Sequence, residues 1–134
     1  MLEIETTAAR QALDVTAPVE EALRRAGVRQ GLCHVMVLGA TAAVVVNEND
    51  DPAIGDDLLD ALARAAPEGA GWRHDRIDGN AHAHIQSALL GPSETVAVED
   101  GRLVLGRWQG LMLVELDGPR RVRRLAVTVL ASAS

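Results

Sequence analysis

The stretch ETVAVEDGRLVL, residues 94–105, decides the fold class. Its two apolar runs, Glu94–Val98 and Arg102–Leu105, flank the turn-forming pair Asp100-Gly101, a pattern typical of a β-hairpin. Hairpins belong to antiparallel sheets, because parallel strands need a crossover connection of a dozen or more residues. The pattern therefore predicts an antiparallel sheet in the last third of the chain.

Further strands are predicted on both sides of this hairpin. Downstream, Trp108–Leu116 and Arg120–Ala131 are separated by the turn Asp117-Gly118-Pro119. Upstream, short apolar or β-branched runs predict four more strands, at Leu2–Thr6, Ala12–Thr16, Gly31–Leu38 and Ala42–Val46. The polar run from Asn47 to Pro52 is expected to be a loop, since six polar or breaker residues follow an apolar strand there.

Three helices are expected between these strands. The first is Val19–Ala26, which follows the helix-start signal Thr16-Ala17-Pro18 and stops at Gly27. The second, Ile54–Ala66, carries leucines at helical spacing, and the third follows a capping Asn80 and runs to about Leu90. Strands separated by tight turns with helices inserted early predict an α+β fold with antiparallel β-sheets and about three helices. At 134 residues, one domain spanning 1–134 is expected.

Composition limits the classes of partner. The net charge of −6 argues against general nucleic-acid binding, which needs a basic surface. No charged-then-apolar leader opens the chain and no apolar stretch reaches membrane length, so the expected location is the cytoplasm, with no membrane partner. Cys33 is the one cysteine and lies in an apolar run, which predicts a buried, inert thiol.

Histidines near the third helix form the first candidate site. Asn80 and His84 are four residues apart and share one helix face, whereas His82 points roughly the opposite way. His74 precedes the helix and could join His84 in binding one divalent metal ion. The structural alternative is that Asn80 only caps the helix, that His84 is a satisfied polar residue and that His74 is an exposed loop residue.

Carboxylates at strand ends form the second candidate set. Glu48, beside Asn47, could act as a general acid or base or as an oxygen ligand of Mg²⁺, or the segment could be a solvated turn before a helix. Glu115 and Asp117 share a strand face, and Arg120 after the turn could hold a phosphate with two hydrogen bonds. The alternative is a turn closed by an arginine–carboxylate pair.

Singly these signals are weak, but their order along the chain is specific and resembles the YjbQ-like family. The residues that carry the resemblance are Thr41-Ala42-Ala43, Asn47-Glu48-Asn49, Asp51-Pro52, His74, Asn80-Ala81-His82-Ala83-His84-Ile85, Leu90-Gly91, Asp100-Gly101, Leu105-Gly106-x-Trp108-Gln109 and Glu115-x-Asp117-Gly118-Pro119-Arg120. The match extends from about Gly31 to Leu130.

The resemblance implies an α+β subunit that assembles as a homotrimer, with a pocket that often holds a metal ion. Some members are secondary thiamine-phosphate synthases, so a metal-assisted transferase acting on a small phosphorylated metabolite is implied. Carried over to this chain, the metal ligands (zinc or magnesium) are His74 and His84. The catalytic residues are Asn47, Glu48 and Glu115, and the ligand-binding residues are Asn80, Asp117 and Arg120.

One position departs from the family pattern. Where the family has histidine in a His-Thr-Thr-Ala-Ala motif, this chain has Gly39, followed by Ala40 and Thr41. Losing one ligand of a three-ligand site is expected to weaken metal binding. Whether His34 or His82 compensates is left open by the sequence. The alternative function is therefore a non-catalytic, small-ligand-binding or assembly member of the family.

Overall fold

The computed structural model describes residues 1–133, which form two antiparallel sheets. The larger sheet has the strand order β1-β8-β3-β5-β6 and the smaller has the order β2-β7-β4. The strands are β1 Leu2–Ile4, β2 Gln11–Asp14, β3 Gly31–Val37, β4 Ala42–Glu48, β5 Ser93–Glu99, β6 Arg102–Leu103, β7 Gln109–Glu115 and β8 Arg123–Ala131. The expected hairpin is present, since Val98 faces Leu103 and Glu99 faces Arg102.

Three α-helices and one 3-10 helix complete the fold, as the sequence predicts for an α+β protein. They are α1 Thr16–Ala26, α2 Pro52–Ala65, η1 Arg73–Arg76 and α3 Ala81–Leu90. Among residues 1–133, no helix has the length and apolar character needed to cross a membrane. The main core lies between the two sheets and α1, and it includes Val19 and Leu23 of α1, Val35 of β3 and Leu113 of β7. Cys33 lies in this core and is fully buried, as predicted.

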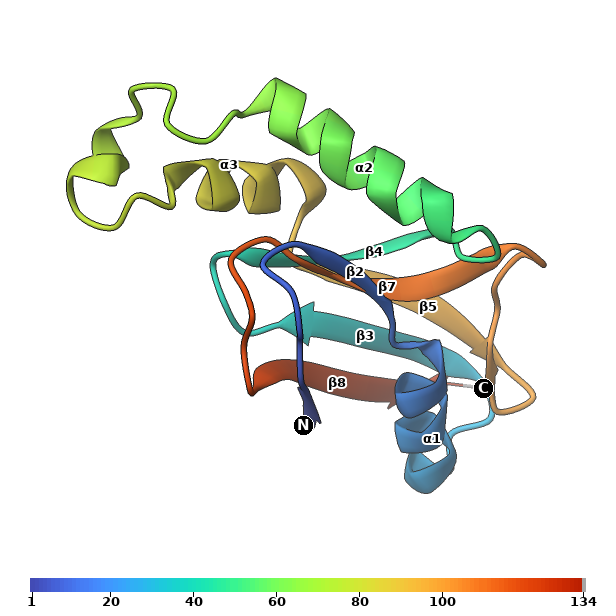
Figure 1. The fold of residues 1–134 in the computed structure, drawn as a ribbon. Helices are drawn as coiled ribbons and strands as arrows, with labels where there is room; N and C mark the ends of the chain where they lie inside the picture. Colours follow the sequence, from blue (N-terminus) through green and yellow to red (C-terminus); the bar gives the residue numbers. More distant parts are fainter. Residues whose placement is uncertain (134) are drawn as a thin grey trace.

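A second core holds α2 and α3 on the other face of the small sheet. Leu59 and Leu62 of α2 and Ala83 of α3 pack against Ala43 and Val114 of the strands. Figure 1 shows both helices on this side, and the segment between them, which contains η1, reaches beyond the strand ends. The order of layers is therefore helices, small sheet, large sheet.

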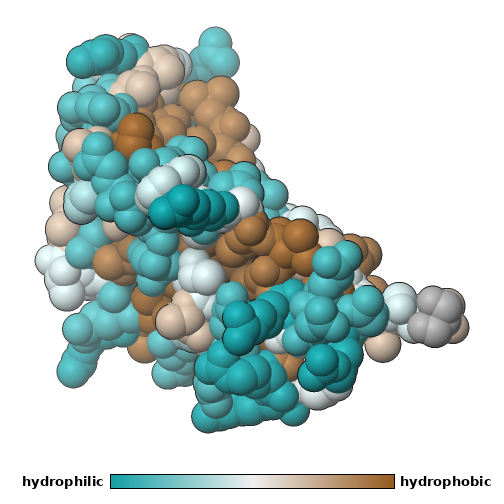
Figure 2. All heavy atoms as spheres, turned by 90° about the vertical axis from the view of Figure 1, so that its right-hand side faces the viewer, coloured by the Kyte–Doolittle hydropathy of each residue, from teal (hydrophilic) through white to brown (hydrophobic). Residues whose placement is uncertain are grey.

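The outer face of the large sheet is not covered by any helix of residues 1–133. In the central strand β3, buried Cys33, Val35 and Val37 alternate with Leu32, His34 and Met36 on the outer side. Leu32 faces Leu130 of β8, and both are large apolar side chains exposed to 49% and 62%. Figure 2 shows hydrophobic atoms reaching the surface in a patch at mid-height of the side that it views.

Several predicted boundaries are wrong in ways that matter for the site. Strand β4 continues to Glu48, so Asn47 and Glu48 are strand residues rather than the start of a loop. Helix α2 begins at Pro52, where Asp51 caps it by accepting a hydrogen bond from the Ala53 N–H. Strand β8 begins at Arg123, not at Arg120, because residues 120–122 still belong to the turn that follows β7.

Candidate functional site

The register of β4 and β7 separates the two predicted catalytic carboxylates. Ala42 at the start of β4 faces Glu115 at the end of β7, whereas Glu48 at the end of β4 faces Gln109. Both strands have seven residues, so the two ends are about 20 Å apart at 3.3–3.4 Å per residue. Glu48 and Glu115 therefore cannot act on the same reacting atom.

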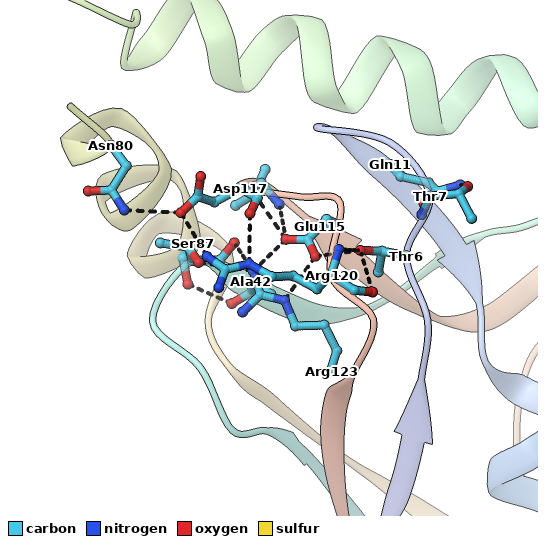
Figure 3. Close-up of polar contacts among 12 residues, drawn as sticks. Thr6, Thr7, Gln11, Ala42, Asn80, Ser87, Glu115, Asp117, Arg120 and Arg123 are labelled. Carbon is cyan, nitrogen blue, oxygen red and sulfur yellow. Dashed lines mark hydrogen bonds and ion pairs between the residues drawn. The ribbon is translucent and has the colours of Figure 1, made fainter. Parts of the chain in front are cut away.

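Glu115 is fully buried and is held by charged and polar partners. Its two oxygens accept hydrogen bonds from Nε (2.9 Å) and Nη2 (2.5 Å) of Arg123, and Oε1 also accepts from the Thr6 hydroxyl (2.8 Å). Figure 3 shows these side chains pointing toward one another from different parts of the chain. Burial alone would raise the pKa of Glu115, but the hydrogen bonds from Arg123 and Thr6 outweigh it and lower the pKa. Glu115 is thus kept ionised as the partner of Arg123.

Asp117 links this cluster to the start of α3. Its Oδ2 accepts hydrogen bonds from Asn80 Nδ2 (3.0 Å) and Arg120 Nη2 (3.0 Å), and its own N–H donates to Glu115. Arg120 Nε also donates to the Asp117 carbonyl, so Arg120 closes its own turn. The three predicted ligand-binding residues are therefore brought together.

Asn80 stands at the N-cap position of α3, but its predicted capping role is wrong. Its side chain makes no capping hydrogen bond, and Asp75 Oδ1 accepts the hydrogen bond from the Ala81 N–H instead. Asn80 uses Nδ2 for Asp117, and its Oδ1 is buried without a partner. The Asn80 side chain bonds to Asp117 rather than to the helix N-terminus, because the turn after β7 brings the Asp117 carboxylate within reach. Local sequence spacing does not reveal this contact.

His74 and His84 meet in a surface cavity, as the sequence suggested. Their ring centroids are 4.8 Å apart with the rings nearly perpendicular, at 87°. The cavity has a volume of about 510 Å³ and also includes Trp72, Arg73 and Ile85 in its lining. His74 Nε2 makes no hydrogen bond, although Asp78 Oδ2 lies 3.8 Å from it, so this nitrogen keeps its lone pair or proton for a ligand. His82 is outside the cavity lining, in keeping with its predicted opposite direction.

The spacing of the two imidazoles fits two ligands of one metal ion. Two imidazoles bound tetrahedrally to zinc at about 2.1 Å have ring centroids about 5 Å apart. Within residues 1–133, however, no group of three or more histidine, cysteine, aspartate and glutamate side chains is placed to share one ion. The remaining coordination positions of such an ion would be left for water or for a ligand.

Glu48 belongs to a different groove, at the start of α2, and its neighbour Asn47 is not part of the lining of that groove. Glu48 and Asp51 line it, with Asp14 of β2 and Arg10, and its volume is about 460 Å³. The contacts of Glu48 are local, because its Oε2 accepts from the Asp51 N–H (3.1 Å). The Asn47 side chain accepts from the N–H of Glu48. The structure does not bring this groove together with His74 and His84.

Sequence reasoning missed the residues that complete the Glu115 cluster. Thr6 lies in the N-terminal segment, and Thr41 accepts a hydrogen bond from Arg123 Nη2 at 2.9 Å. Arg123 was not singled out from the sequence. A usable signal was its spacing of two residues from the apolar Leu125, which puts both on the inward face of the strand once β8 is known to begin at Arg123.

Comparison with known proteins identifies the family. A family model described as UPF0047 protein YjbQ-like matches residues 1–132. A UPF0047 protein of Methanocaldococcus jannaschii is 35% identical over 119 residues, covering 89% of this chain and 85% of the relative. The UPF0047 protein YugU of Bacillus subtilis is 38% identical over 122 residues, covering 89% of each chain.

Solved structures agree with the sequence matches. A YbjQ-like protein of unknown function from Sulfolobus solfataricus has a TM-score of 0.93 and 35% identity, covering 98% of this chain and 94% of the other. A hypothetical protein from Aeropyrum pernix has a TM-score of 0.92 and 38% identity, covering 98% and 96%. The agreement extends over nearly the whole chain, and the protein therefore belongs to the YjbQ-like UPF0047 family.

Proposed function

We propose that this chain binds a divalent metal ion, and through it a small phosphorylated molecule, in the cavity of His74 and His84. The observation that carries the proposal is the pair of imidazoles at a 4.8 Å centroid separation, with His74 Nε2 buried and making no hydrogen bond. Neutral histidine is the commonest metal ligand in proteins, and an ion with two protein ligands keeps positions open for oxygen atoms of a phosphate.

The cavity suits a small ligand in size and lining. About 510 Å³ lies within the 300–1,000 Å³ range of small-molecule sites. Trp72 and Ile85 offer apolar contacts, and Arg73 offers a cation for a phosphate group. Asn80 directly precedes Ala81 of the lining and is tied to Asp117. We assign Asn80, Asp117 and Arg120 to the polar rim of this site.

Metal binding tests the proposal directly. We expect isothermal titration of purified protein with Zn²⁺ to show one site per chain, and His74→Ala and His84→Ala each to weaken it at least tenfold. His34→Ala is the matched control, because His34 is a half-buried histidine on the outer face of the large sheet. The proposal fails if the wild-type protein binds no divalent ion, or if all three variants bind like the wild type.

The same imidazole pair favours a second candidate, the metal-assisted transferase that the family resemblance implies. In that reaction the ring nitrogen of a thiazole phosphate displaces pyrophosphate from a pyrimidine pyrophosphate, and a bound metal ion would stabilise the negative charge that develops on the leaving pyrophosphate. In this chain the hydrogen bonds run from Asn80 to Asp117 and on to Glu115, so these residues would orient a substrate at the start of α3. Asn47 and Glu48 lie at the other end of β4, where they would serve a separate reaction or none.

Growth rescue separates binding from catalysis. In a strain that lacks thiamine-phosphate synthase, the transferase candidate predicts growth without thiamine when this chain is expressed, and no growth with His84→Ala at equal protein level. If the wild-type chain does not rescue growth although it binds metal, the transferase candidate fails and the binding function remains.

We also propose that the chain forms a homotrimer, with a second copy covering the outer face of the large sheet. Leu32, Met36 and Leu130 expose apolar surface there, which monomeric proteins usually cover. Light scattering is expected to give three times the mass of one chain, and Leu32→Glu is expected to give the mass of a single chain. A single-chain mass for the wild type would contradict the proposal.

A further inference from the structure

Arg123 uses only part of its hydrogen-bonding capacity inside the protein. Nε donates to Glu115 Oε1, and Nη2 donates to Glu115 Oε2 and to Thr41 Oγ1. Its side chain is 7% exposed. Among the hydrogen bonds of residues 1–133, none involves the third nitrogen, Nη1, which carries two N–H groups of a charged guanidinium.

Gly39 is what keeps Nη1 accessible. Gly39 lies in the exposed loop between β3 and β4, and a Cβ placed on it would lie 2.7 Å from Arg123 Nη1. Its φ is outside the left-handed region, so the backbone does not require glycine. The guanidinium therefore occupies the space of a side chain at position 39, and the surface above it is open.

We propose that Arg123 Nη1, at the Gly39 opening, binds the phosphate group of a ligand. Nη1 reaches the surface and carries two N–H groups of a charged guanidinium, and an oxyanion would accept charge-assisted hydrogen bonds from both. Glu115 cannot fill this role, because its two oxygens are already paired with Nε and Nη2. Arg123 thereby supplies a cation at the position where this chain has Gly39.

The surroundings favour an anion over a cation. Arg121 and Arg124 flank Arg123 in sequence and are exposed. Arg124 Nε lies 3.8 Å from Glu3 Oε1, whereas no ion pair among residues 1–133 involves Arg121, which leaves Arg121 as a further cation for an anion. Arg120, which the sequence had suggested for phosphate, is instead held by the side chain and carbonyl of Asp117. Neither Gly39 nor Arg123 lines the cavity of His74 and His84, so the site does not depend on the metal proposal.

Side-chain NMR of the wild-type protein provides the first test. With arginine labelled with ¹⁵N, inorganic phosphate added at pH 7.5 and constant ionic strength is expected to shift the Arg123 signals in a saturable way. Arg10 is the internal control, since it is also partly buried but donates to Gln86 and to the Leu59 carbonyl. No saturable shift at Arg123 would overturn the proposal, and an equal response to acetate would overturn its assignment to phosphate.

Gly39→Ala provides the second test. The added methyl group would lie 2.7 Å from Nη1, which is too close, so Arg123 or the loop must shift and Nη1 loses its place at the opening. Phosphate is therefore expected to bind at least tenfold more weakly, while Ala40→Ser, a change at the next exposed residue, is expected to bind as the wild type does. Unchanged affinity in a folded Gly39→Ala variant would overturn the proposal. His74→Ala is expected to keep phosphate binding at Arg123, which separates failure of this site from failure of the metal site.

Discussion

Glu115 and Glu48 are both strand-end carboxylates of the same sheet, yet their surroundings differ completely. Glu115 is fully buried and bound by Arg123 and Thr6, residues that come from both ends of the chain. Glu48 is half-buried, and its contact with the Asp51 N–H lies within its own loop. The two residues are equivalent in the sequence, since each follows an apolar strand and precedes a turn with a proline.

The difference shows that similar polar motifs can form a buried, stabilising network at one end of a sheet and make only local contacts near the surface at the other. At the Glu115 end, ionic and hydrogen-bonding groups join the N-terminal segment, the β4 start and β8 into one buried network. At the Glu48 end, the polar groups shape the entry to a helix. Removing side chains at the two ends should therefore have very different consequences.

The largest effect is expected for Glu115→Ala. Removing one partner of a buried ion pair leaves Arg123 with an uncompensated charge, which costs about 3–5 kcal/mol in the free energy of unfolding. Urea denaturation monitored by circular dichroism would measure the loss. The matched change at the other end, Glu48→Ala, is expected to stay within about 0.5 kcal/mol, because it removes a single local contact near the surface.

A similar loss in both variants would break the comparison between the two ends. If Glu115→Ala were as stable as the wild type, the ion pair with Arg123 would not stabilise the fold. Glu115 would then be expected to act only in ligand binding. If Glu48→Ala were the more damaging change, the groove at the start of α2 would be the structurally demanding end of the sheet.

Lowering the pH is expected to reduce gradually the contribution of Glu115 to the free energy of unfolding. Its pKa is lower in the folded protein than in the unfolded chain, so the stabilisation is complete above the unfolded value of about 4.3 and is lost as the pH falls through the folded value. The difference in unfolding free energy between wild type and Glu115→Gln should therefore shrink below about pH 4. A constant difference down to pH 2 would show that Glu115 has no shifted pKa.

Much of the fold was predictable because its signals are local. The Asp100-Gly101 hairpin, the leucine spacing of α2 and the buried Cys33 depend on patterns within a dozen residues. The predicted boundaries and roles that are wrong depend on residues far away in the sequence. β4 extends to Glu48 because Gln109 of β7 continues the pairing, and Asn80 leaves its capping role because Asp117 is 37 residues away in sequence but 3.0 Å away in space.

The candidate site was predictable only in parts. Helical spacing put Asn80 and His84 on one face, but their separate uses, one toward Asp117 and one toward His74, needed the tertiary structure. The structure does not bring Glu48 together with the histidines. The sequence shows that Glu48 ends a strand, but it does not show which distant residues lie near that end in space. Arg123 was the largest omission, since only the β8 register shows that it faces inward.

Thr6→Val probes the buried end without altering its charges. The Thr6 hydroxyl donates to Glu115 Oε1 (2.8 Å) and accepts from the Arg120 N–H (2.8 Å), so valine leaves the Arg120 N–H without this acceptor and Glu115 Oε1 with Arg123 Nε as its remaining donor. A loss of about 1–3 kcal/mol is expected, smaller than for Glu115→Ala. Thr7→Val is the neighbouring control, because Thr7 is exposed and bonds only with Gln11. Equal losses in the two variants would contradict a special role for the buried hydroxyl.

Asp51→Ala should give the smallest measurable loss and sharpen the comparison from the exposed end. Asp51 caps α2 through the Ala53 N–H at 2.9 Å, and such caps contribute about 1 kcal/mol. Asp51→Ser keeps a capping oxygen and is expected to recover most of that loss, while Asp50→Ala, next to it and without a capping bond, should change little. If Asp51→Ser is as unstable as Asp51→Ala, the charge rather than the cap stabilises this end. The exposed groove would then depend on electrostatics, as the buried end does, and the contrast between the two ends would lie in burial alone.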